Sequence, residues 1–171
     1  MNLFILSLCF SECAEWMFDK HVSKMIVEAV QMLSTAKHML DPFPEGSDEQ
    51  KKIYKITHKN HPVSIWIRTS LENYVWTLNM VEAMHNEWRF RYGHPETKFH
   101  ASFLIAQHLL KHAPSADQFP EKGLTPFAQA MPDEYRGEDA VEAYRRYYQS
   151  PDKKRMASWK RRTPPAWYTE P

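Results

Sequence analysis

Three side chains in residues 19–40 have the types and spacing to do acid–base chemistry. This segment, DKHVSKMIVEAVQMLSTAKHML, contains no Gly or Pro, and its apolar residues recur at the three-and-four spacing of an α-helix. At about 100° per residue, His21, Lys24 and Glu28 fall in one polar band of that helix. We therefore predict a helix over residues 19–40, with Asp19 as its N-cap.

Glu28 is the only acidic residue of this segment after Asp19, and small or apolar residues flank it. A surface helix usually carries several charged residues on its outer face, so we expect this helix to be largely buried. A carboxylate held there needs partners or a shifted pKa. Either Glu28 simply pairs with Lys24 while His21 fills the core, or the three residues form a catalytic site.

The start of the chain offers a second reactive group. Residues 2–8 are predicted to be a short, buried, extended segment, because the opening MNLFILSLCF is almost entirely apolar. An α-amine has a pKa of about 8, so part of it is a neutral nucleophile near neutral pH, whereas lysine has a pKa of about 10.4. We expect the amine and Glu28 to face the same site.

Length and composition favour one helical domain. The 171 residues, 43% of them hydrophobic, suffice for a single core, so we expect one domain over residues 1–171. Only four glycines occur and no GxGxxG or GxxxxGK[ST] motif is present, so no nucleotide cofactor, and indeed no cofactor, is expected. No plausible strand pairs are found, which indicates an all-α fold.

Further helices follow from periodicity and end signals. We predict one long helix or two joined helices over residues 63–92, closed by Gly93, and another helix over residues 95–112. Residues 138–150 are predicted to be helical, and a short helix follows Ser150. Residues 41–50 are predicted to be a linker. Residues 114–135 contain no convincing element, and loops of this length tend to be functional or disordered.

Nine histidines raise the question of a metal. Ligands converging from several helices would build such a site, and this alternative corresponds to a metal-dependent hydrolase or nucleotide-modifying enzyme. No HExxH or ExxH pair supports it, and a histidine followed by Pro can instead cap a helix or shape a turn. The histidines considered as ligands are His58, His61, His94 and His100.

Clustered basic residues point to nucleic acid. The net charge is only +1, but residues 145–162 contain eight basic residues and one acid, and a basic, aromatic tail begins at about residue 150. This pattern fits phosphate contacts with base stacking, or else a tail packed over the core. The predicted contacts to nucleic acid, expected to be double-stranded DNA, are Asn60, His61, Arg68, Arg136, Arg145, Arg146, Lys160, Arg161, Trp167 and Tyr168.

The remaining composition indicates a soluble, cytoplasmic monomer without membrane contact. Cys9 and Cys13 lie four residues apart with no second pair, so free thiols in a reducing compartment are expected. The apolar start lacks the basic region and cleavage site of a signal peptide, and no apolar run reaches membrane-spanning length.

The order of these landmarks resembles the phage-type pyrimidine-dimer DNA glycosylases and AP-lyases of the endonuclease V type. The resemblance rests on DKH at 19–21 with Glu28, NHP at 60–62 before a long helix, MPDEYRG at 131–137 and PPAWY at 164–168. The chain also resembles phage proteins that share DKHVxKMIxE, NHP and TPFAQAMPDEY. A phage-infected host cell would then be its location.

This resemblance implies a small all-α domain whose N-terminus lies inside the site. In that family the α-amine exposed by removal of Met1 attacks the sugar C1′, the base leaves, and the resulting imine allows strand cleavage. By similarity Asn2 would carry the amine, Glu28 would stabilise the sugar cation, and His21 and Lys24 would complete the site. Leu3, Val27 and Gln31 stand where the family has arginines that grip the lesion strand. The identity of the substrate therefore stays open, and a different base, a modified nucleotide or RNA are the alternatives.

Overall fold

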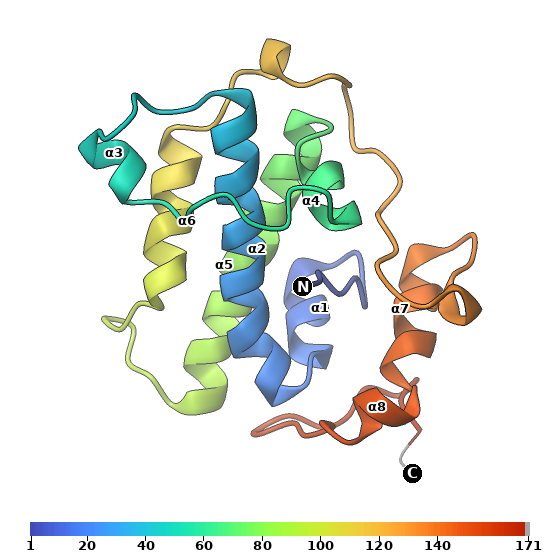
Figure 1. Cartoon of the computed structure of the whole chain (residues 1–171). Helices are drawn as coiled ribbons and strands as arrows, with labels where there is room; N and C mark the ends of the chain where they lie inside the picture. Colours follow the sequence, from blue (N-terminus) through green and yellow to red (C-terminus); the bar gives the residue numbers. More distant parts are fainter. Residues whose placement is uncertain (170–171) are drawn as a thin grey trace.

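Two long helices form the centre of the molecule. In the computed structural model, which describes residues 1–169, α2 (Asp19–Leu40) packs against α5 (Leu71–Tyr92). Helices α4 (Pro62–Ile67) and α6 (Ala101–Lys111) also pack on α2, and α1 (Phe10–Trp16) packs on α5 (Figure 1). The shorter elements are α3 (Asp48–Lys51), η1 (Ala116–Gln118), η2 (Asp133–Tyr135), α7 (Ala140–Tyr148) and α8 (Pro151–Lys154).

The all-α prediction is confirmed. Residues 1–169 contain no β-strand, and their one isolated bridge joins Ser70 to Glu121. No helix within these residues is both long and apolar enough to cross a bilayer. The last two residues of the predicted tail, Glu170 and Pro171, lie outside the described part of the chain.

The predicted helix over residues 19–40 has the same bounds as α2, but its predicted N-cap is wrong. Phe18 occupies the N-cap position, and no side chain caps the helix there. The Asp19 carboxylate instead accepts hydrogen bonds from the backbone N–H of Lys160, at 2.9 and 3.1 Å. Asp19 therefore attaches the C-terminal segment to the start of α2.

Residues 62–92 form two helices, in agreement with one of the two predicted arrangements. Helix α4 ends at Ile67, and Ser70 caps α5 by accepting a hydrogen bond from the N–H of Asn73 at 3.1 Å. Gly93 ends α5 as predicted, because its φ of +64° is a conformation that favours glycine.

Two other boundaries differ from the prediction. The helix expected from residue 95 begins only at Ala101, because the His100 Nδ1 accepts the N–H of Ser102 and so caps α6 at that point. The linker over residues 41–50 contains the start of α3, which Ser47 caps. In both cases a cap, rather than hydrophobic periodicity, sets the start of the helix.

The N-terminal segment is buried from Asn2 to Ser7, as expected, whereas Leu8, which was also predicted to be buried, is 64% exposed. Leu3, Phe4, Ile5 and Leu6 are all at most 2% exposed. The Cys13 thiol contacts this segment twice, since its Sγ lies 3.3 Å from the Leu6 nitrogen and 3.3 Å from the Phe4 carbonyl oxygen. Burial raises the pKa of Cys13 to about 11, so this thiol stays protonated and serves in packing.

Arg91 joins α5 to the start of α2 and to the end of α1. Its guanidinium is fully buried and donates to the carboxylates of Glu87 at 2.5 Å and Asp19 at 3.2 Å. It also donates to the carbonyl oxygens of Met17 at 2.6 Å and Glu15 at 2.5 Å. These contacts satisfy the polar groups at the α1–α2 junction.

We predict that Arg91→Met lowers the free energy of unfolding by about 3–5 kcal/mol, because two buried carboxylates lose their shared partner. Urea denaturation followed by circular dichroism measures the change. Arg155→Met is the matched control, since Arg155 pairs with Asp152 at the surface and its loss should leave the midpoint unchanged. An equal midpoint for Arg91→Met and the wild type would contradict this role.

Candidate functional site

The start of the chain lies against Glu28 of α2. The backbone nitrogen of Asn2 donates to Glu28 Oε2 at 2.8 Å, and the Met1 amino group lies 3.9 Å from the same oxygen. Glu28 is 8% exposed, so this carboxylate is held inside the protein. The structure thus brings the first two residues of the chain into contact with an acid that lies 26 and 27 residues away in the sequence.

Asn2 is held by the long loop before α7. Its Nδ2 donates to the carbonyl oxygen of Ala130 at 2.7 Å, while its Oδ1 lies 3.2 Å from the Tyr144 hydroxyl. The same hydroxyl lies 2.8 Å from the carbonyl oxygen of Ala128. Residues 114–135 contain only the short helices η1 and η2, and one function of this loop is to fix the chain's start beside Glu28.

Two lysines surround the carboxylate. Lys24 Nζ lies 3.2 Å from Glu28 Oε1, and its side chain is 58% exposed. Lys153 of α8 is partly buried, with its Nζ 5.1 Å from the centre of the Phe4 ring. Burial lowers the pKa of Lys153, the positive charge of Lys24 lowers it further, and Glu28 opposes the shift. Sequence reasoning missed Lys153, because only the fold brings α8 to α2.

His61 also belongs to this site. Its Nδ1 accepts the N–H of Val63 at 3.2 Å and caps α4, as its position before Pro suggested. Burial lowers the pKa of His61, followed by the positive charge of the N-terminus, while the Met1 backbone and Glu28 act in the opposite direction. The imidazole therefore lies beside Met1 and is neutral near neutral pH.

Thr35 positions the segment that carries His61. Its hydroxyl accepts the N–H of Thr57 at 3.1 Å and lies 3.1 Å from the Thr57 carbonyl oxygen. Thr35 continues the polar band of α2 beyond Glu28 and is buried. Within this polar band, Glu28 binds the N-terminus, and Thr35, two turns further along α2, binds the 57–61 segment.

His21, predicted to be part of the site, is a packing residue in the structure. Its ring stacks on Phe4 at 4.6 Å and on Phe18 at 5.4 Å between centroids, and its Nδ1 shares a 2.6 Å hydrogen bond with the Tyr148 hydroxyl. Burial lowers the pKa of His21 to about 3, assisted by the positive charge of Lys153. Such an imidazole stays neutral and fixes α7 against α2.

The predicted arginine contacts to nucleic acid are largely engaged within the chain. Arg145 Nε donates to the carbonyl oxygen of Leu6 at 2.9 Å, and its guanidinium lies 5.1 Å from the Trp16 ring and 5.5 Å from the Trp167 ring. Arg146 donates to the Tyr135 carbonyl oxygen at 3.1 Å. These contacts match the alternative of a tail packed over the core.

The other predicted contacts are similar. Backbone carbonyl oxygens accept hydrogen bonds from the guanidinium groups of Arg68, Arg136 and Arg161, and Lys160 Nζ lies 5.3 Å from the Tyr92 ring. Tyr168 is buried edge-on against Trp159. Asn60 is exposed in the turn before α4. Most of the predicted contacts therefore also take part in interactions within the chain.

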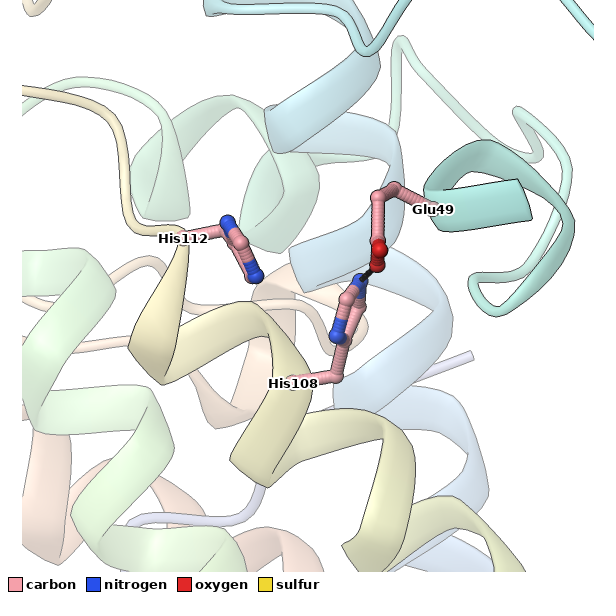
Figure 2. A group of neighbouring side chains, drawn as sticks. All are labelled: Glu49, His108 and His112. Carbon is pink, nitrogen blue, oxygen red and sulfur yellow. Dashed lines mark ion pairs between the residues drawn. The ribbon is translucent and has the colours of Figure 1, made fainter. Parts of the chain in front are cut away.

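The four histidines proposed as metal ligands do not form a common site. His58 is exposed, His61 and His100 cap helices, and His94 packs on Trp88 at 4.1 Å between ring centroids. Within residues 1–169, the one metal-compatible group of three or more side chains is a different one, Glu49, His108 and His112 (Figure 2). The histidine count raised the question of a metal, but the four histidines considered as ligands are not in this group.

A separate open hollow of about 660 Å³ lies between α1 and α5. Cys9, Glu15, Asn86 and Arg162 are among its lining residues, and none of the residues around the chain's start takes part. This hollow and the Glu28 site are therefore distinct surfaces.

Comparison of the chain with models of protein families, with curated proteins and with solved structures found no match. Any function must therefore be argued from the arrangement of the residues themselves.

We predict that His21 makes the protein less stable in acid. The folded state binds a proton at His21 only near pH 3, whereas an unfolded histidine does so near pH 6.5, so stability is complete above pH 6.5 and falls as the pH drops below it. The expected contribution is up to about 1.4 kcal/mol per pH unit between pH 6 and pH 4.

The His21→Phe variant should show a shallower decrease of unfolding free energy with falling pH, measured by urea denaturation at several pH values. His58→Asn is the control, because His58 is exposed and its removal should leave the pH dependence as in the wild type. Equal pH dependence for wild type and His21→Phe would refute the assignment.

Proposed function

We propose that this protein is a DNA N-glycosylase and AP-lyase that uses an α-amine at the start of the chain, with Glu28 as its acid–base partner. The observation that carries the proposal is the 2.8 Å distance between the Asn2 nitrogen and Glu28 Oε2. Removal of Met1 would convert this backbone nitrogen into an α-amine already in contact with the carboxylate. If Met1 is retained, its own amine lies 3.9 Å from that oxygen.

The chemistry follows from these two groups. Glu28 accepts a proton from the ammonium, and the freed amine attacks the sugar C1′ while the C1′–N bond to the base breaks. The base leaves with a proton, and opening of the sugar ring gives an imine between C1′ and the amine. Loss of a proton from C2′ then expels the 3′ phosphate by β-elimination, and water releases the sugar fragment from the amine.

The surroundings of Glu28 suit a phosphate-bearing substrate. The amino terminus, Lys24 and Lys153 place three cations around one carboxylate. Lys24 is mostly exposed. The Met1 side chain is only 5% exposed, whereas Met1 as a whole is half-buried, so the accessible part of Met1 is its backbone. A strand held by the lysines would therefore meet the amine at the surface.

We predict that borohydride, added with duplex DNA containing an abasic site, traps a covalent adduct by reducing the imine. Proteolysis and mass spectrometry should locate the adduct on the first peptide, and the intact mass of the free protein should identify the residue that carries the amine. Glu28→Gln should slow single-turnover cleavage by about 10²–10⁴-fold, as for loss of a general acid–base group.

The matched control is Glu72→Gln, since Glu72 bonds the Gly123 N–H in an exposed region of α5 and should leave cleavage unchanged. Salt-dependent DNA binding without adduct or turnover, in a folded protein, would favour a non-catalytic binding module instead. Cleavage that needs an added divalent metal and gives no adduct would favour a metal-dependent hydrolase.

Lys24 and Lys153 are expected to contact the DNA backbone. We predict that Lys24→Met with Lys153→Met weakens binding to all duplex sequences and lowers the slope of log K against log salt concentration by about 1–2. Fluorescence anisotropy over a salt series measures both quantities. Lys20→Met with Lys55→Met, at other exposed positions, should leave the slope nearly unchanged, and an unchanged slope in the first variant would exclude these contacts.

A further inference from the structure

A second group of chemically matched side chains lies far from Glu28, where α6 ends near α3. His108 and His112 lie four residues apart on the end of α6, so both rings project from the same side of the helix (Figure 2). Glu49 of α3 faces them, and one ligand atom from each of the three residues lies within 4.8 Å of the other two. Two imidazoles and a carboxylate are a common ligand set for zinc.

The side chains of His108 and Glu49 lie close together without forming a hydrogen bond. His108 Nε2 lies 3.1 Å from Glu49 Oε2, yet this nitrogen is buried and has no hydrogen-bond partner. A metal ion between the two side chains would give this nitrogen a partner and would also bind the carboxylate oxygen.

We propose that Glu49, His108 and His112 bind a first-row divalent metal ion of the zinc type, which fastens α3 to α6. The three protein ligands leave a fourth tetrahedral position for water or another group. Ligand oxygens and nitrogens about 2.0–2.2 Å from zinc lie a little over 3 Å from one another, in keeping with the His108–Glu49 distance.

The surroundings support binding of a cation. The Phe43 ring lies 5.5 Å from each imidazole between centroids, so an apolar wall covers one side of the group. Lys52 Nζ lies 3.0 Å from Glu49 Oε2 and so orients this carboxylate. Lys52 also adds a positive charge, which makes the affinity lower than that of a site without it.

A metal ion bound to Glu49, His108 and His112 would stabilise the position of α3. Helix α3 has only four residues, and none of them is buried, so side-chain packing holds it weakly. A metal ion shared with α6 would attach this helix and the linker before it to the helical core. The inference is independent of the proposed glycosylase chemistry, because these residues are not among those around Glu28.

The test uses the full chain, freed of metal by a chelator and then titrated with ZnCl₂ in a calorimeter. We expect one zinc ion per chain, a higher melting temperature with zinc, and visible absorption bands of a tetrahedral site when Co²⁺ replaces zinc. His108→Asn and Glu49→Gln should each weaken zinc binding by at least about 10–100-fold, since even loss of a supporting contact has that effect.

His58→Asn and Glu45→Gln serve as matched controls, because both residues are exposed and lie outside the group. Their zinc affinity should equal that of the wild type. Absence of stoichiometric zinc, or equal affinity in the His108→Asn variant and the wild type, would overturn the proposal. The borohydride adduct on DNA is measured separately in chelator, so failure of either proposal is distinguishable from failure of the other.

Discussion

The hydrogen bond between the chain's second backbone nitrogen and Glu28 constrains much of the structure. A carboxylate at 8% exposure must find charged or hydrogen-bonding partners, since its desolvation is otherwise costly. Glu28 obtains them from the Asn2 nitrogen and from Lys24, the first of which requires the N-terminal segment to enter the protein. The apolar residues 3–6 make that entry favourable, because they fill the space between α2 and the C-terminal helices.

Asn2 extends this constraint to the opposite end of the chain. Its side chain bonds the loop before α7 and approaches Tyr144, while Arg145 of the same helix donates to the carbonyl oxygen of Leu6. The following helix brings Lys153 over Phe4. Residues of α7 and α8 therefore contact the N-terminal segment, which in turn contacts α2. Figure 1 shows α7 on the same side of α2 as the start of the chain.

Hydrophobic periodicity allowed α2 and its polar band to be predicted, because the positions of a helix that face the core are occupied by apolar residues. The contact between Glu28 and the chain's start was expected on other grounds, namely the apolar opening of the chain and the resemblance to the glycosylase family. Lys153 and the Glu49–His108–His112 group were not found, since their proximity depends on the packing of distant helices. The start of α6 was misplaced because His100 acts as a cap, and histidine is not among the usual capping residues.

The basic tail shows why a count of charges does not define an interface. Arginine has several donors and readily binds backbone carbonyl oxygens in irregular segments and near helix ends. Arg145, Arg146 and Arg161 do so here, and the aromatic residues of the tail cover α1 and α2. These guanidinium groups stabilise an irregular segment of the chain. Lys153 belongs to the same tail, yet its ammonium lies 5.1 Å from the Phe4 ring and near Glu28, so one basic residue of the tail reaches the start of the chain.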